Sequence, residues 1–162
     1  MRKRLISPIV PTDAVREHGW LELDRAAVVE VTSEAATYPI EGALLNEGAR
    51  GWRAATPGVQ TVRLLFDKPQ TINRIRLVFK EQEFARTQEF VLRWSEDGGI
   101  SWKDIVRQQW NFSPPTTVDE CEDYSVELLA ATALELTINP DISRSDPRAS
   151  LESLRIAVQR SG

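Results

Sequence analysis

The chain has 162 residues, of which 41% are hydrophobic and 27% are charged, so it is neither a disordered protein nor a typical multidomain enzyme. Its formal net charge of −4 excludes non-specific nucleic-acid binding by the domain as a whole, because such binding needs an excess of basic residues. One cysteine and one histidine cannot form an internal disulfide or a clustered Cys and His metal site, which indicates a reducing compartment.

The N-terminal segment combines a basic cluster with an apolar run that Pro8 and Pro11 interrupt. This run is too short for a secretory signal peptide, and no apolar run in the sequence reaches the ~20 residues that span a bilayer. We therefore expect a cytoplasmic protein without a membrane span. Residues 1–25 would form an N-terminal arm with a short helical turn running to His18, and residues 26–160 would form a single domain.

Alternation of apolar and polar side chains is the main signal for secondary structure. Ile75, Leu77 and Phe79 share one face of the segment 73–80, which is the period-two pattern of a half-buried strand. A short helix is expected at 40–45. Strands are expected, in chain order, at 28–32, 61–66, 73–80, 89–94, 102–109, 124–128, 134–138 and 154–158. Many short strands with one apolar face predict an all-β, antiparallel β-sandwich.

The connections between antiparallel strands must alternate between the two ends of such a sandwich. Three short turns, at 67–70, 96–99 and 130–132, then share one end. The longer connections gather at the opposite end, which we call the loop rim; it comprises 47–60, 81–87, 110–119 and 139–149. Because rigid scaffolds present binding residues on longer loops, the loop rim is the predicted functional site.

An ordered series of short motifs resembles the discoidin or coagulation-factor C-type domain. The similarity covers roughly residues 26–159 and includes the segments 41–45, 51–53, 61–69, 72–77, 90–95, 97–102 and 149–154. It implies a jelly-roll, galactose-binding-like β-sandwich similar to carbohydrate-binding modules. Members of this family are mostly non-catalytic, and they bind glycans, phospholipid headgroups or proteins through loops at one end.

Many members of this family hold a structural calcium through an Asp after an Ala-Leu pair and a Glu in the last strand. The corresponding positions here are Leu45 and Ser153, and a leucine supplies no oxygen ligand from its side chain. We therefore expect no metal and no other cofactor. Asn46, Glu47 or Glu152 would substitute only if the register were shifted by one residue.

The segment 95–102 matches the Asp-box pattern, Ser-x-Asp-x-Gly-x-Ser/Thr-Trp, of sialidase-like propellers. A propeller needs several copies at blade spacing, and the sequence has one. The motif therefore predicts a structural turn, in which Asp97 bonds backbone amides and Trp102 packs against the base of the hairpin.

Two segments of the loop rim carry side chains suited to a sugar. Trp110 and Phe112 would form a plate for the apolar face of a sugar ring while Asn111 reaches its hydroxyls, or the two aromatics would instead close the end of the core. Trp52 is better explained as a packed anchor. The guanidinium of Arg53 suits carboxylates or vicinal acceptors.

A charged group at 81–86 completes the predicted site. Glu81, Glu83 and Arg86 would pair with Arg53 or form a solvated cluster. The predicted ligand-binding residues are Trp52, Arg53, Glu83, Arg86, Trp110, Asn111 and Phe112.

No constellation of catalytic residues is evident, because a nucleophilic site would have to recruit the isolated His18 or Cys121. Phosphate-binding loops, dinucleotide fingerprints and zinc-protease patterns are absent from the sequence. We therefore expect a non-catalytic module that binds a glycan or small sugar. The alternative is an intracellular protein-protein interaction or dimerisation module without a sugar ligand, and the oligomeric state is left open.

Overall fold

The structure is a computed structural model that describes residues 19–45 and 50–159. Its helices are α2 (Leu23–Ala26) and α3 (Glu41–Leu44). Its strands are β1 (Ala27–Val31), β2 (Trp52–Arg53), β3 (Gln60–Lys80), β4 (Arg86–Ser95), β5 (Lys103–Phe112), β6 (Asp119–Asn139), β7 (Ser150–Leu151) and β8 (Ser153–Val158). Within these ranges no helix combines the length and the apolar character that crossing a bilayer requires.

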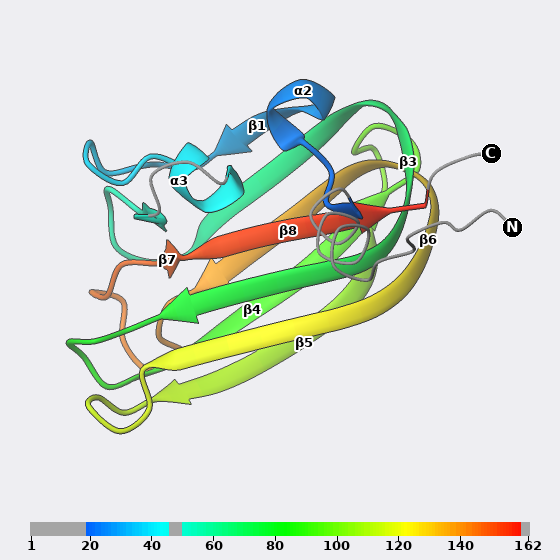
Figure 1. Ribbon diagram of the computed structural model, residues 1–162. Coiled ribbons are helices and arrows are strands. Elements are labelled where there is room, and N and C mark those ends of the chain that lie inside the picture. The colour runs from blue at the N-terminus through cyan, green and yellow to red at the C-terminus, as the bar shows by residue number, and fades with distance from the viewer. Residues whose placement is uncertain (1–18, 46–49, 160–162) are drawn as a thin grey trace, which may run out of the picture.

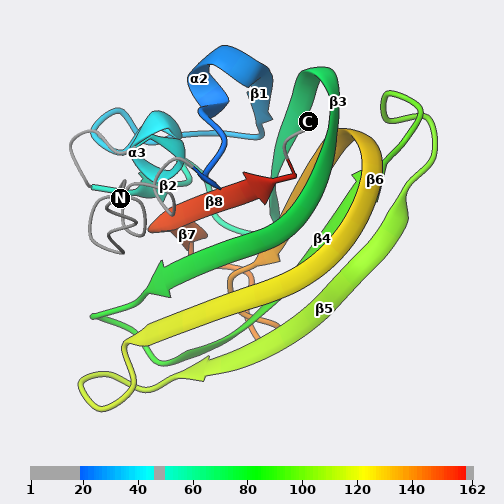
Figure 2. The same cartoon turned by 45° about the vertical axis from the view of Figure 1, so that its right-hand side comes forward.

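Two long, curved strands, β3 and β6, each contribute to both layers of the fold (Figures 1 and 2). The first part of β3 pairs with β1 and with the last part of β6, and β4 and β5 extend this larger layer. The last part of β3 pairs with β8 and with the first part of β6, which forms the smaller layer. All of these pairings are antiparallel, so the predicted all-β sandwich is confirmed.

The predicted turns at 67–70 and 130–132 are wrong, because both segments are bends within continuous strands. The pairing of β3 with β6 shifts register between Leu65 and Arg74, and Ala130 adopts a left-handed φ of 55°. Irregularities of this kind let a strand bend sharply and continue in the facing layer. The bends still lie at the predicted end of the sandwich (Figure 1).

The core lies between the two layers, where the predicted inward faces meet. The rings of Phe79 from β3 and Phe90 from β4 have centroids 5.2 Å apart and connect the layers directly. Burial of each large apolar side chain contributes about 1.5–3 kcal/mol. Leu154 and Ile156 of β8 are also buried. The predicted inward positions that are confirmed as buried are Ile75, Leu77, Phe79, Phe90, Leu92, Leu128, Leu134, Leu136 and Ile138.

The segment before β1 packs onto the sandwich where the structure describes it. Leu21 N donates to Ile156 O at 2.7 Å, Trp20 forms a bridge with Ala157, and Leu23 is buried in the core. The helical turn predicted up to His18 lies outside the described residues.

Where the structure describes them, the connections of the loop rim gather at one end of the sandwich, as the alternation of loops predicts (Figure 1). Backbone hydrogen bonds join neighbouring connections across this end: Gly58 N donates to Pro147 O at 3.1 Å, and Glu81 N donates to Val118 O at 2.8 Å. At the other end, Gly98 N donates to Thr132 Oγ1 at 2.8 Å.

The Asp-box hairpin between β4 and β5 is confirmed as a structural turn. Asp97 accepts hydrogen bonds from Ser95 Oγ at 2.7 Å, Ser101 N at 2.9 Å and Ser101 Oγ at 2.6 Å. The hydrogen bonds from Ser101 and Ser95 hold the pKa of this carboxyl far below its usual value. Gly98 and Gly99 supply the positive φ angles of 73° and 93° that the turn requires.

A row of alternating charges crosses the outer face of the larger layer. Each member lies directly opposite the next in the strand register: Glu30, Arg63, Glu135, Arg93 and Asp104. Arg63 contacts Glu30 at 3.0 Å and Glu135 at 2.7 Å, and Arg93 contacts Asp104 at 2.9 Å. Opposite charges across neighbouring strands favour this register. We call this row the charge ladder.

Candidate functional site

The loop rim contains a shallow depression of about 700 Å³ between two of its connections. It is lined by Gly58, Val59, Asn139, Asp141, Ile142, Ser143, Arg144, Ser145 and Asp146. Three apolar side chains are exposed at this end, namely Val59 at 54%, Phe84 at 59% and Ile142 at 46% of their surface. A polar depression with exposed apolar side chains around it suits a ligand that has both kinds of surface.

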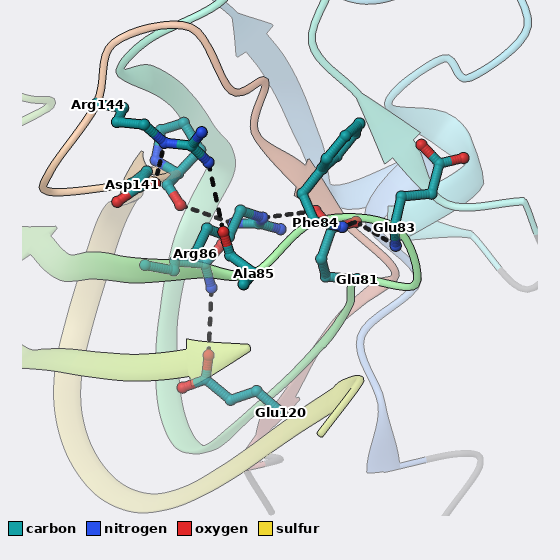
Figure 3. A network of polar contacts seen from close by, with 10 residues as sticks. Glu81, Glu83, Phe84, Ala85, Arg86, Glu120, Asp141 and Arg144 are labelled. Atoms are coloured by element: carbon teal, nitrogen blue, oxygen red, sulfur yellow. Dashed lines mark hydrogen bonds and ion pairs between the residues drawn. The ribbon is translucent and has the colours of Figure 1, made fainter. Parts of the chain in front are cut away.

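Phe84 projects from the turn between β3 and β4. The carboxylate of Glu81 organises this turn, since its Oε2 accepts from Glu83 N at 3.0 Å and from Phe84 N at 3.3 Å (Figure 3). The turn leaves Phe84 largely exposed to solvent, and an exposed aromatic ring can pack on the apolar side of a sugar ring. Phe84 is not among the seven predicted residues. The signal for it is a single aromatic between charged residues in a connection of the loop rim.

Arg144 reaches from the last long connection to the turn that carries Phe84 (Figure 3). Its Nη2 donates to Ala85 O at 3.4 Å, and its Nε lies 3.2 Å from Asp141 Oδ2. Burial opposes ionisation of Asp141, but hydrogen bonds from the Ser143 amide and from Arg144 outweigh burial and lower its pKa. An ionised Asp141 fixes a half-exposed guanidinium beside the depression, where it can donate to hydroxyls or carboxylates.

Arg86 lies beneath this surface and serves the structure. Its Nε contacts Glu81 Oε1 at 2.6 Å, its Nη1 donates to Pro140 O at 2.9 Å, and its guanidinium lies 4.7 Å from the centroid of the Phe112 ring. Burial raises the pKa of Glu81, but the hydrogen bond from Arg86 and the turn amides outweigh it, so the net pKa falls. The predicted pairing of Arg86 and Glu81 with Arg53 is wrong, because Arg86 and Glu81 form an ion pair with each other.

Three of the seven predicted residues are too buried to touch a ligand. Trp52, Arg86 and Phe112 expose 1%, 4% and 1% of their surface. Trp52 is a packed anchor whose Nε1 donates to Ser33 O at 2.9 Å. Phe112 closes the end of the core beneath Arg86, so the aromatic plate is not formed. The reason is that Phe112 points inward from the end of β5 and the Arg86 guanidinium lies over its ring.

The other four predicted residues retain exposed surface but are spread over the end of the molecule. Trp110 is half-buried against the core, and the neighbouring Asn111 is exposed and accepts from Thr87 Oγ1 at 2.6 Å. Glu83 is exposed beside Phe84. Arg53 is exposed on β2, with its guanidinium 4.5 Å from the centroid of the Tyr38 ring. Their role in ligand binding stays a prediction.

An arginine contacts the segment in which the family resemblance implies a calcium ligand. From β8, Arg155 donates to Ala43 O at 2.9 Å and to Leu45 O at 3.3 Å, at the carbonyl end of α3. Burial lowers the pKa of Arg155, with a smaller effect from Arg76. The described residues contain no group of three or more His, Cys, Asp or Glu side chains suited to a metal, and Asn46 and Glu47 lie outside them.

Replacement of Arg155 with methionine is expected to lower the free energy of unfolding by about 1–3 kcal/mol, because two inward carbonyls lose a charged donor. Urea unfolding measures this change. The exposed Arg148→Met is the matched control and should change stability by less than about 0.5 kcal/mol. Equal effects of the two substitutions, or a rise in the Tm of the unmodified protein on adding calcium, would contradict this account of α3.

Comparison with protein-family models found no match, and comparison with curated proteins found none either. Solved structures do match. The module CBM32-3 from a family 31 glycoside hydrolase of Clostridium perfringens has a TM-score of 0.61 and 15% identity, over 88% of this chain and 97% of that one. The chain has the fold of this carbohydrate-binding module. The galactose-binding-like β-sandwich implied by the resemblance is thereby confirmed.

Two further structures show how widely this fold is used. The family 32 module from C. perfringens NanJ, in complex with galactose, has a TM-score of 0.57 and 11% identity over 85% of this chain and 97% of that one. Reduced XRCC1, bound to the DNA pol beta catalytic domain, has a TM-score of 0.58 and 15% identity over 84% and 97%. At these identities the likeness concerns the fold, and one fold carries many functions.

Proposed function

We propose that the protein is a non-catalytic module that binds carbohydrate through the loop rim. The observation that carries this proposal is that the exposed Phe84 ring lies in the turn that Arg144 contacts through Ala85 O, while Asp141 orients Arg144 at the edge of the depression. A sugar ring has an apolar face that packs on an aromatic ring and hydroxyls that bond to charged groups. Modules of this fold have been solved with galactose and with 4,5-unsaturated mannuronic acid, which supports the same use here.

Each side chain then has a distinct role. Phe84 is the platform, Arg144 donates to ring hydroxyls or a carboxylate, and Asp141 holds Arg144 in position. Asn139 and Ser145 line the depression with further hydrogen-bonding groups. Because the depression is shallow, we expect a single sugar to bind with a Kd near 1 mM, about −4 kcal/mol, and longer glycans to bind more tightly.

An NMR titration with a panel of neutral and acidic sugars tests this proposal. Backbone amide signals of 58–59, 81–85 and 139–146 should shift together with one ligand class, while those of the Asp-box hairpin at the other end should stay fixed. Absence of shifts at millimolar sugar, or shifts confined to other surfaces, would overturn the proposal.

Protein recognition through the same surface is the second candidate. The exposed apolar side chains Val59, Phe84 and Ile142 favour it, and so does the structural neighbour that was solved bound to another protein. Light scattering over a range of protein concentrations tests the dimer form of this idea, since a concentration-independent monomer would exclude it. A cytoplasmic location is part of both proposals, and cell fractionation would test it.

A further inference from the structure

A buried polar chain runs inward from the loop rim between β4 and β6 (Figure 3). Gln88 exposes none of its surface and Glu120 exposes 1%. The Gln88 amide bridges two ionisable groups: its Oε1 accepts from Arg86 Nη1 at 3.1 Å, and its Nε2 donates to Glu120 Oε1 at 3.2 Å. A guanidinium and a carboxyl group are thus held apart by one neutral amide.

Both ends of this bridge carry a buried atom without a hydrogen-bond partner among the described residues. These atoms are Arg86 Nη2 and Glu120 Oε2. A buried polar atom without a partner is costly, so the two groups are poised to take a closer partner. Arg86 already has one strong partner, Glu81, on the side of the loop rim.

The surroundings of Glu120 favour its protonated form. Glu122 and Tyr124 face it from β6 and Arg86 lies near it from β4, with Glu81 beyond Arg86. Burial, followed by the proximity of the Glu122 carboxyl group, raises the pKa of Glu120 to about 8, against smaller opposing effects of Gln88 and Arg86. Two neighbouring carboxyl groups of which one is buried do not both ionise readily.

We propose that Glu120 and Glu122 bind one proton between them, and that this proton sets how firmly Arg86 holds the turn that presents Phe84. With the proton bound, the charged partner of Arg86 is Glu81 at 2.6 Å. When the proton leaves, Glu120 carries a negative charge on the far side of Gln88 and competes with Glu81 for Arg86.

Competition between Glu120 and Glu81 for Arg86 affects Phe84 because Glu81 also holds the turn that carries Phe84. The second oxygen of Glu81 accepts from the amides of Glu83 and Phe84, so a weaker contact with Arg86 loosens this turn. The consequence for ligand binding rests on the proposed function of the loop rim. The coupling between the proton and the turn is a property of the protein without ligand.

The direction of the pH effect follows from the raised pKa. The folded protein keeps a proton that the unfolded chain releases near its ordinary pKa of 4.5. The stability contributed by this proton is therefore fully present below about pH 4.5 and is lost as the pH rises through about 8. As the pH rises through about 8, we also expect the turn at 81–85 to become more mobile.

Fluorine NMR of protein labelled with 4-fluorophenylalanine tests the coupling without any sugar. The Phe84 signal, identified by its loss in Phe84→Leu, should titrate with a midpoint near pH 8, while the core residue Phe90 stays fixed. Glu120→Gln should abolish this step. Glu122→Gln removes the neighbouring carboxyl group and should move the midpoint to lower pH.

Three results would overturn the proposal: no step at Phe84 in the unmodified protein, the same step in Glu120→Gln, or an unchanged midpoint in Glu122→Gln. If Glu120→Gln does not fold, the titration of the Phe84 signal in the unmodified protein and in Glu122→Gln still tests the proposal. Since no sugar is present, failure of this test leaves carbohydrate binding standing, and failure of the sugar titration leaves the coupling standing.

Discussion

Replacement of Phe84 with alanine is expected to weaken sugar binding by about tenfold to thirtyfold, since aromatic anchors contribute about 1.4–2 kcal/mol to binding of this kind. Because the ring is 59% exposed, the free energy of unfolding should change by less than about 0.5 kcal/mol. Titration with the sugar that binds best, together with urea unfolding, separates the two effects.

The matched control for this substitution is Ile100→Ala, which removes an exposed apolar side chain from the Asp-box hairpin at the other end. Ile100 is 85% exposed, and its loss should leave the affinity unchanged. Equal affinities of the Phe84 variant and the unmodified protein would show that the sugar uses another surface. A stability loss in Phe84→Ala would show that the ring packs.

The largest loss of stability is expected from Arg86→Met. This substitution breaks a buried ion pair from one side and removes the donor to Pro140 O, which costs about 3–5 kcal/mol in comparable cases. The Glu81 carboxylate, whose side chain is 15% exposed, is left without its charged partner. Urea unfolding measures the loss.

Two further variants make the interpretation of Arg86→Met specific. Arg107→Met breaks an exposed pair with Glu89 and should cost less than about 1 kcal/mol. Adding Glu81→Gln to Arg86→Met removes the unpaired charge and should restore part of the stability. Similar losses for Arg86→Met and Arg107→Met would mean that the buried pair contributes no more than a surface pair.

The faces of the strands could be predicted from the sequence because the pleat of a strand enforces a period of two. Ile75, Leu77 and Phe79 are inward for this reason alone. Strand continuity could not be predicted in the same way. Residues such as Asp67 and Pro69 are found both in turns and in the irregular bends of long strands, and only pairing with neighbouring strands distinguishes the two.

The sequence predicted which end of the molecule carries the candidate site. It predicted only some of the residues that form the site. Phe84 and Phe112 both lie in the loop rim, yet the first is exposed and the second is buried under Arg86. Their difference depends on which side chain packs over each ring, and the contact of Arg86 with Phe112 joins two segments far apart in the sequence. Arg144 illustrates the same limit, because its contact with Ala85 joins residues 59 positions apart.

The charge ladder helps to set the register between the strands of the larger layer. Glu135 lies at the middle of the larger layer, is 8% exposed, and has an arginine opposite it on each neighbouring strand. If β4 joined the sheet two residues out of step, Val91 or Ser95 would stand where Arg93 belongs. The alternation of inward and outward side chains would survive such a slip, so hydrophobic burial alone would not reject it. After such a slip Glu135 would keep its contact with Arg63 but would no longer lie opposite Arg93, so the charge ladder favours the observed register over one that burial alone would tolerate.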